Sequence, residues 1–186
     1  AEEQLLLPMV ERLLSKDAAL RVLWAPRSPQ RFQAVVEALS SKGISVTQRS
    51  SLGPDMDGPM PDVQVIVGDS IGEMDAYYPV ADLVFVGASL VDHGGHNIIE
   101  PLGLGRPVVM GPSTFGIDFA AELAAQTGAF ESLPDVADLE NRVSQLLADA
   151  SALKRMSAAA VAFSADKNGA AGRTFAGLLP LLGPPA

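Results

Sequence analysis

The stretch GASLVDHGGHNIIEP, residues 87–101, decides how the rest of the chain is organised. It holds both histidines of the chain, a Gly-Gly pair and a glutamate between two apolar runs, LVFV at 83–86 and PVVM at 107–110. Short apolar runs of this kind predict buried strands. The stretch is therefore expected to form a strand-to-helix turn and the helix that follows, at the carboxyl end of a parallel strand. In open α/β sheets, ligands bind at this edge.

The residue types in this stretch suit a phosphorylated ligand. Gly94 and Gly95 let the backbone come close to a bound group. A helix that starts near His96 or Asn97 presents N–H groups and a positive dipole end to an anion. Asn97 and Glu100 lie three residues apart and share one helix face. The predicted ligand has a phosphate on the turn and a sugar diol on Glu100.

Composition excludes several classes of protein. The chain of 186 residues is 48% hydrophobic and only 19% charged, which fits one globular domain or one lobe of a larger enzyme. Its net charge of −9 argues against a nucleic-acid partner. The absence of cysteine excludes disulfides and Cys-based zinc sites, and no run approaches the roughly 18 apolar residues of a membrane span. The chain begins with Ala1 and passes straight into a helical pattern, which fits a processed or truncated product.

Strands and helices alternate along the chain. A helical stripe near the start includes Met9 and Leu13 and puts Pro8 in the first turn. Six strands are predicted, over 20–25, 44–48, 63–67, 83–86, 108–110 and 129–132. Beside the helix of the opening stretch, helices are predicted over 29–41, 72–79, 115–127 (with Phe115, Phe119 and Leu123 on one face), 139–147, 157–165 and 169–179. This order predicts an α/β fold with a doubly wound, Rossmann-like parallel sheet of about six strands.

Three strand-to-helix turns carry polar or glycine signals, Ala25–Ser28, Gly68–Glu73 and Gly87–Asn97. Right-handed crossovers place all three at one edge of the sheet, so they are expected to converge on one crevice. Arg27 in the first turn is interpreted either as a guanidinium that grips a phosphate or as a surface arginine.

The second turn also has two interpretations. GDSIGEM, residues 68–74, resembles a nucleotide-binding turn, although it contains neither G-x-G-x-x-G nor G-K-[ST]. Ser70 and Glu73 alternatively fit a helix capping box. The two interpretations are compatible and both stay open here.

Two other kinds of site are disfavoured. His93 and His96 with one nearby carboxylate lack a third strong metal ligand, so no metal is expected. Ser89, Asp92 and His96 lie within eight positions and without the G-x-S-x-G elbow, so a hydrolase triad is discounted.

Four segments together resemble one family. APRSPQRF (25–32), VIVGDSIGEMDAYYPVADLVFVGASL (65–90), GGHNIIEP (94–101) and GRPVVMGPSTF (105–115) resemble the carboxyl-terminal half of the 3-deoxy-D-manno-octulosonic acid (Kdo) transferases. The resemblance runs from about Leu20 to the end, in the family's order and spacing. Ser28 departs from the family, in which histidine often follows the Pro-Arg pair.

The resemblance implies one lobe of a GT-B glycosyltransferase that moves Kdo from CMP-Kdo to a lipid A precursor. In such enzymes the carboxyl-terminal lobe binds the donor. The amino-terminal lobe holds the general base and the acceptor, and the enzyme works without a metal or cofactor at the cytoplasmic face of the inner membrane. Residues 20–186 are then expected to be the donor domain, and residues 1–19 a linker or leading helix. The acceptor lobe is absent from this chain. The fragment alone is therefore expected to be inactive, with no catalytic residue of its own. The expected donor-binding residues are Arg27, Gly72, Glu73, Met74, Ser89, Gly95, His96, Asn97 and Glu100.

Two alternatives remain. One is another enzyme of the same architecture, such as a UDP-sugar transferase or a UDP-sugar epimerase. A nucleotide-sugar-binding module without catalytic activity is the other.

Overall fold

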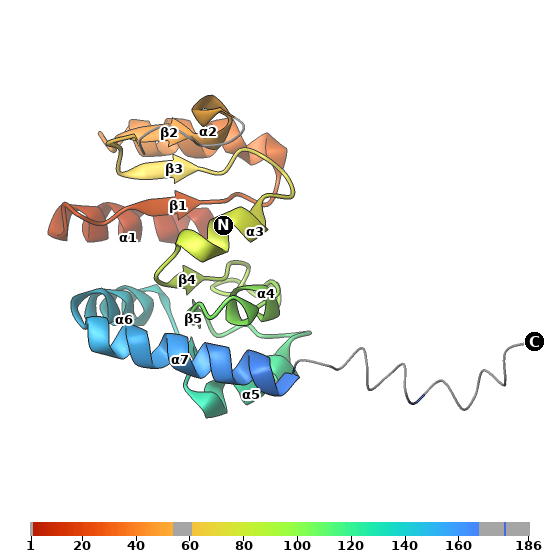
Figure 1. Ribbon diagram of the computed structural model, residues 1–186. Coiled ribbons are helices and arrows are strands. Elements are labelled where there is room, and N and C mark those ends of the chain that lie inside the picture. The colour runs from red at the N-terminus through yellow and green to blue at the C-terminus, as the bar shows by residue number, and fades with distance from the viewer. Residues whose placement is uncertain (1, 54–60, 168–176, 178–186) are drawn as a thin grey trace, which may run out of the picture.

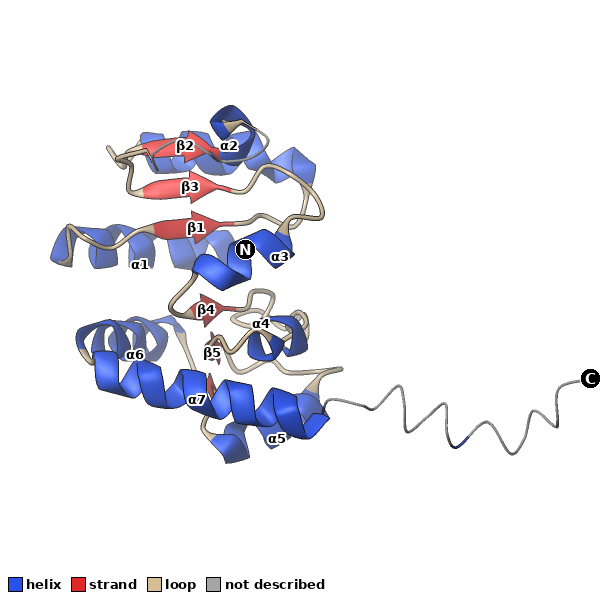
Figure 2. Ribbon diagram, in the orientation of Figure 1, coloured by secondary structure: helices blue, strands red, loops and turns tan. Residues whose placement is uncertain are grey.

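The computed structural model describes residues 2–53, 61–167 and 177 (Figures 1 and 2). The strands are β1 (Val22–Trp24), β2 (Val46–Gln48), β3 (Val65–Val67), β4 (Val84–Phe85), β5 (Val108–Met110) and β6 (Phe130–Ser132). The α-helices are α1 (Glu2–Lys16), α2 (Pro29–Ser40), α3 (Met74–Tyr77), α4 (Ile99–Gly103), α5 (Asp118–Thr127), α6 (Val136–Ala148) and α7 (Ala150–Lys167). Two short 3₁₀ turns, Arg49–Leu52 and Tyr78–Val80, complete the described elements.

All six predicted strands form and all of their pairings are parallel, but they make two three-stranded sheets and not one. The orders are β1-β3-β2 and β4-β5-β6. In Figure 1, β1 and β4 are the facing edges of the two sheets, and the strands of both sheets point in the same direction. In the described part of the chain no ladder joins β1 to β4. The strand order still reverses between β1 and β4, which is the arrangement that favours ligand binding in doubly wound folds.

Side chains alternate between two apolar clusters on opposite faces of the sheets. In β5, Val109 belongs to the cluster that α1, α2 and α6 cover, whereas Val108 and Met110 belong to the cluster that α4, α5 and α7 cover. All three side chains are fully buried. The run PVVM therefore reads as continuously apolar because helices cover both faces of this strand.

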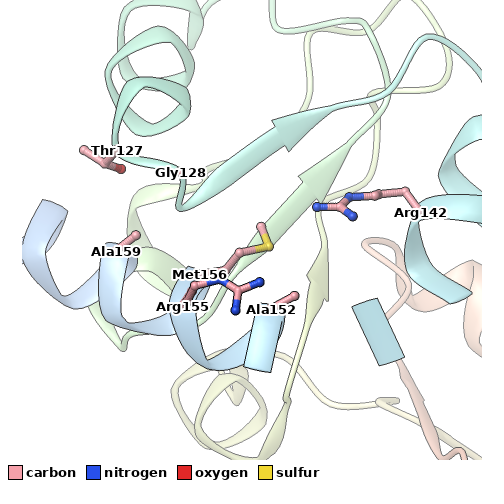
Figure 3. Close-up of a pocket in the computed structure, with 7 residues that line it drawn as sticks. All are labelled: Thr127, Gly128, Arg142, Ala152, Arg155, Met156 and Ala159. Carbon is pink, nitrogen blue, oxygen red and sulfur yellow. The ribbon is translucent and has the colours of Figure 1, made fainter. Parts of the chain in front are cut away.

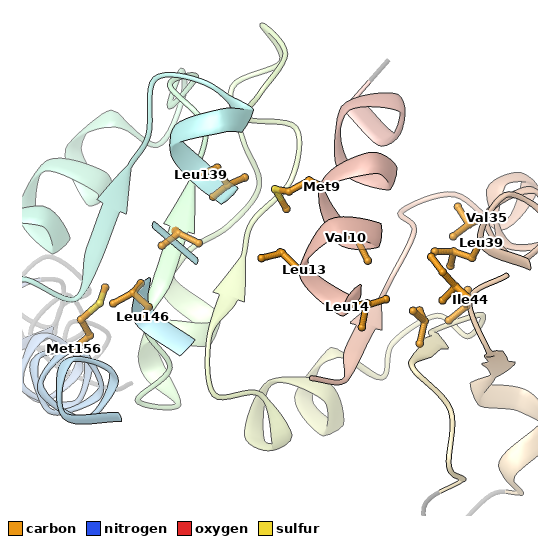
Figure 4. Close-up of a cluster of buried hydrophobic side chains, with 13 residues drawn as sticks. Met9, Val10, Leu13, Leu14, Val35, Leu39, Ile44, Leu139, Leu146 and Met156 are labelled. Atoms are coloured by element: carbon orange, nitrogen blue, oxygen red, sulfur yellow. The ribbon is translucent and has the colours of Figure 1, made fainter. Parts of the chain in front are cut away.

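Helix α1 joins the two halves of the molecule. Figure 4 shows Met9 and Leu13 pointing toward Leu139 of α6, while Val10 and Leu14 point to the opposite side. Pro8 lies inside this helix and not in its first turn, so that part of the prediction is wrong. An interior proline costs about 3 kcal/mol. Burial of an apolar side chain contributes about 1.5–3 kcal/mol, and four buried side chains of α1 outweigh the proline.

Glu140 fixes α1 to α6 and gives a pH-dependent prediction. Its carboxylate accepts hydrogen bonds from Arg12 Nε at 2.8 Å and Lys16 Nζ at 3.0 Å. The bond from Arg12 is the largest cause that lowers the pKa of Glu140 from its ordinary value of 4.5, and Lys16 adds to it. A carboxyl whose pKa is lower in the folded state stabilises the fold above the unfolded value and loses that contribution as the pH falls.

We therefore expect the wild-type free energy of unfolding to fall more steeply below about pH 4.5 than that of Glu140→Gln. Urea unfolding followed from pH 7 to pH 3 measures both slopes. Identical slopes would show that the pair does not contribute.

Two helix predictions differ from the structure. Phe115 and Phe119 are 80% and 77% exposed, and Ala121 and Ala124 form the buried side of α5, because small side chains let this helix approach its neighbours closely. The alanine-rich segment 157–165 is part of α7, as predicted. The helix predicted over 169–179 lies outside the described residues.

Candidate functional site

The turns after β1 and β4 meet at the carboxyl edge of the sheets, where Figure 1 also places α3 and α4. Pro29 at the first helical position begins α2, so the turn that holds Arg27 is short. Arg27 Nη1 lies 3.4 Å from His96 Nδ1, although the two residues are 69 positions apart. The predicted meeting of these two turns is observed.

His96 is a neutral hydrogen-bonding group in this arrangement. Burial is the larger cause that lowers its pKa below 6.5, and the charge of Arg27 lowers it further, whereas Glu2 acts in the opposite direction. The imidazole is therefore neutral at pH 7. Because a guanidinium only donates, Nδ1 is the acceptor and Nε2 carries the proton. Arg27 and His96 can thus each present an N–H donor to a ligand.

Three consecutive backbone N–H groups, those of Ala88, Ser89 and Leu90, form what we call the anion nest. In the structure they donate to the carboxylate of Glu2. Ala88 N lies 2.6 Å from Glu2 Oε2, and both Ser89 N and Leu90 N lie 2.8 Å from Glu2 Oε1. Ala88 has a φ of 62°, and no other described residue except glycine has a positive φ. A left-handed residue turns successive N–H groups toward one point, which makes a concave anion site.

The anion nest is rigid because Ser89 is fully buried behind it. Ser89 Oγ donates to the Val86 carbonyl at 2.8 Å and accepts from Gly111 N at 2.9 Å. The Ser89 carbonyl accepts from Ser113 N at 3.0 Å. The hydroxyl of Ser89 is therefore committed inside the protein, so the residue can contact a ligand only through its backbone. The same commitment removes it from any Ser-His-Asp triad.

The predicted helix start at Gly95–Asn97 is not the anion site. Gly95 N donates to the Ala88 carbonyl at 2.8 Å, and His96 N donates to the Gly87 carbonyl at 3.1 Å. These two N–H groups fold the turn back on itself and are not free for an anion. Helix α4 begins three residues after His96 and has only five residues, too few for a strong dipole.

The Gly-Gly pair approaches the protein's own chain. A Cβ at Gly94, whose φ is 86°, would lie 2.3 Å from the Phe115 carbonyl oxygen. A Cβ at Gly95, whose φ is 72°, would lie 2.2 Å from Met110 Cε. The prediction that these glycines make room for a ligand is thus corrected, since Met110 of β5 and the loop after β5 occupy that room.

Asn97 and Glu100 contact each other, but Asn97 precedes α4, so the prediction that both lie on one helix face is corrected. Asn97 Nδ2 donates to Glu100 Oε1 at 3.0 Å, and Asn97 Oδ1 accepts from Ile99 N at 2.9 Å. Both side chains are exposed. Burial is the first cause that raises the pKa of Tyr78, and the charge of Glu100 is the second, which places Glu100 near the 3₁₀ turn after α3. An exposed carboxylate held in this way suits a sugar diol.

The Glu73 side chain is engaged within the protein. It accepts from Tyr77 Oη at 2.8 Å, pairs with Arg49 Nη2 at 3.0 Å and contacts Ser70 Oγ. The hydrogen bond from Ser70 is the largest cause that lowers the pKa of Glu73, followed by that from Tyr77. Ser70 and Glu73 bond side chain to side chain, and no side chain caps α3, so the capping-box interpretation is wrong.

The other two predicted residues of this turn differ in exposure. Gly72 is exposed, has a φ of 85° and has open space around it. Met74 is half-buried and packs against the cluster under α4, α5 and α7. Backbone groups and Gly72 are thus the parts of this turn that can reach a ligand.

Two surface hollows lie at opposite edges of the sheets. One of about 290 Å³ is lined by Ser89–Asp92, Pro112 and Ser113, beside the anion nest. The other, of about 240 Å³, includes Arg142 and Arg155 and lies beside Gly128, ahead of β6 (Figure 3). The first is at the ligand-binding edge of the fold and shares Ser89 and Leu90 with the anion nest.

The described residues contain no group of three or more His, Cys, Asp or Glu that could hold a metal ion. His93 is exposed, and its Nδ1 lies 2.9 Å from the Asp92 carbonyl oxygen. Among residues 2–53 and 61–167, every helix is too short or too polar to be a candidate membrane span.

Comparison with known proteins identifies the relatives of this chain. No family model matches it. It is 38% identical over 162 residues to the 3-deoxy-D-manno-octulosonic acid transferase of Bordetella pertussis, covering 87% of this chain and 37% of that protein. It is 34% identical over 184 residues to the transferase of the same name from Haemophilus influenzae, covering 98% of this chain and 41% of that protein. The chain is related to the Kdo transferases.

A solved structure from the Kdo transferases agrees with this kinship. The crystal structure of the C-terminal CMP-Kdo binding domain of WaaA from Acinetobacter baumannii matches with a TM-score of 0.74 and 29% identity. The match covers 84% of this chain and 80% of that domain. The chain spans about two fifths of the length of the curated Kdo transferases it matches. The predicted fold and the predicted resemblance to the Kdo transferases are thus confirmed.

Two groups at the site were not predicted from the sequence. Glu2 lies 86 positions from Ala88 and was not a candidate. The N–H groups of Ala88 and Leu90 also lie outside the predicted set, because no residue type in the sequence marks a backbone donor there. The signal that could have found them is their position directly after β4.

Proposed function

We propose that the chain is the donor-binding domain of a Kdo transferase and binds CMP-Kdo at the carboxyl edge of its sheets. The observation that carries this proposal is the structural match to a CMP-Kdo binding domain at 29% identity. The meeting of Arg27, His96 and the anion nest at the same edge supports it.

Each group has a proposed role in binding CMP-Kdo. Arg27 and the Nε2–H of His96 donate to the phosphate, Glu100 accepts from the ribose hydroxyls, and the backbone near Gly72 contacts the cytosine. Negative charge grows on the phosphate of CMP as it leaves the sugar. Donors fixed in place before the reaction stabilise that charge without reorganisation.

The acceptor and the membrane belong to the wider proposal. We propose that the full-length protein transfers Kdo to a lipid A precursor at the cytoplasmic face of the inner membrane, with the general base supplied by an amino-terminal lobe. No metal or cofactor has a role in this proposal. The domain alone binds the donor and does not transfer the sugar.

Calorimetry with two nucleotides tests the proposed donor. The chain is expected to bind CMP and to bind UDP at least about tenfold more weakly, because a site that hydrogen-bonds one base leaves polar groups unpaired with another. Tighter binding of UDP would favour a UDP-sugar enzyme and would contradict the proposal.

Glu100→Ala is expected to weaken CMP binding by about tenfold, because two charge-assisted hydrogen bonds to the ribose are lost. Glu122→Ala in α5 is a matched control with another exposed glutamate and should leave the affinity unchanged. Equal calorimetric affinities of the wild type and Glu100→Ala would remove Glu100 from the site.

A further inference from the structure

The anion nest is occupied by a side chain of the chain itself. Both oxygens of the Glu2 carboxylate are engaged, one by two N–H groups at 2.8 Å and the other by one at 2.6 Å. Hydrogen bonds from backbone N–H groups to a charged carboxylate are among the stronger ones in proteins. The nest therefore accommodates a whole carboxylate and not merely a single oxygen.

The nest does not depend on Glu2 for its shape. Ser89 is fixed from behind by Val86 and Gly111, and a Cβ at Gly111 would lie 2.4 Å from the Ser89 carbonyl oxygen. The left-handed conformation of Ala88 costs energy that a glycine would avoid, and such strain is typical of ligand sites. The sheet side of the molecule thus holds the nest open when its occupant leaves.

Glu2, by contrast, lies on α1 ahead of the buried side chains of that helix. It is the first residue of α1, and its neighbour Glu3 pairs with Arg31 Nη2 at 2.5 Å on the molecular surface. The buried anchors of α1 begin at Met9, two turns further on. Segments with few buried contacts open more readily than buried ones. The first turn of α1 can therefore release the carboxylate while the rest of the helix stays packed.

The nest lies inside the donor site. Glu2 is close enough to His96 to affect its pKa, and His96 contacts Arg27. Ser89 and Leu90 line both the nest and the neighbouring hollow of about 290 Å³. A ligand whose phosphate lies on Arg27 and His96 can therefore reach the nest and the hollow with its sugar.

We propose that the anion nest is the subsite for the carboxylate of the donor sugar, and that Glu2 closes this subsite until the donor displaces it. The inference rests on the proposed function, because Kdo is a sugar acid and CMP-Kdo carries a carboxylate as well as a phosphate. The Glu2 carboxylate then competes with the donor for the nest, which couples donor binding to the position of the first turn of α1.

Glu2→Gln tests the competitor directly. Glutamine keeps the size of the side chain, but it is neutral and only one of its two terminal atoms can accept a hydrogen bond, so it holds the nest less strongly than the carboxylate does. A ligand's apparent affinity is reduced by the fraction of molecules in which its site is closed. Free Kdo is therefore expected to bind Glu2→Gln about tenfold more tightly than the wild type, by calorimetry. Glu3→Gln, one residue along the same turn, should bind Kdo like the wild type.

A second measurement uses the wild-type chain and does not depend on the variant folding. The amide NMR signals of Ala88, Ser89 and Leu90 should shift on titration with free Kdo and stay unmoved with cytidine. The opposite result would be that these amide signals shift with CMP and not with Kdo, and that CMP binds Glu2→Gln more tightly than the wild type. That result would assign the nest to the phosphate and overturn the carboxylate subsite.

Failure of this inference is distinguishable from failure of the proposed function. One outcome is that CMP binds, Kdo has the same affinity for the wild type and Glu2→Gln, and the three amide signals do not shift. In that case Glu2 only stabilises the turn, and the inference is wrong. If neither CMP nor Kdo binds the wild type or the variant, the proposed function itself is wrong.

Discussion

Replacement of Arg27 by alanine is expected to weaken CMP binding by about tenfold to 100-fold. Arg27 is exposed at the carboxyl end of β1 and 3.4 Å from His96, so its guanidinium is free to take a phosphate bidentately. Calorimetry of both proteins with CMP measures the loss. Cytidine, which lacks the phosphate, should bind the wild type and Arg27→Ala equally.

The matched control is Arg21→Ala, because Arg21 lies just before β1 and Arg27 lies just after it. Arg21 pairs with Asp62 at 3.0 Å at the opposite edge of the sheet. Both variants change the net charge by the same amount. If they weaken CMP binding equally, the effect is one of overall charge, and Arg27 is not a phosphate ligand.

Gly94→Ala should cause the largest loss of stability, about 3–5 kcal/mol. An alanine there must adopt a φ of 86°, and its Cβ would lie 2.3 Å from the backbone oxygen of Phe115. Backbone atoms cannot move aside as a flexible side chain can, so the turn after β4 and the loop after β5 must separate. Urea unfolding monitored by circular dichroism measures the change.

Gly116→Ala measures the cost of a positive φ without a steric clash of the added Cβ. Gly116 has a φ of 85°, almost the same as Gly94, but its Cβ would have open space. It is expected to lose only about 1–2 kcal/mol, the cost of a left-handed residue. Equal losses for the two variants would show that the loop after β5 yields easily, which would contradict the rigid turn described above.

The sequence predicted the fold well because local patterns determine it. The apolar runs that became β1 to β6 alternate with amphipathic helices, and each run is bounded by Gly, Pro or polar residues. The pattern could not show that β1 and β4 lack a ladder between them, since strand pairing depends on the geometry of both sheets. Nor could it place Pro8 inside α1, because tertiary burial of Met9 and its neighbours outweighs the local cost of proline.

The sequence predicted which turns meet at the candidate site, but not the contacts of their polar atoms. The contact of Arg27 with His96 and that of Asn97 with Glu100 follow from motif positions and residue spacing. The roles of individual polar atoms depend on contacts far apart in the sequence. Ser89 is tied to Gly111, and Glu73 is tied to Arg49, so their side chains are engaged within the protein. Glu2 reaches the anion nest through the packing of a whole helix, which no local pattern reveals.

The most direct test of the account is a crystal structure of this chain with CMP bound. The account predicts the nucleotide at the carboxyl edge of the sheets, with its phosphate within hydrogen-bonding distance of Arg27 and its ribose hydroxyls on Glu100. CMP bound elsewhere, for example in the hollow between Arg142 and Arg155 at the opposite edge, would contradict it.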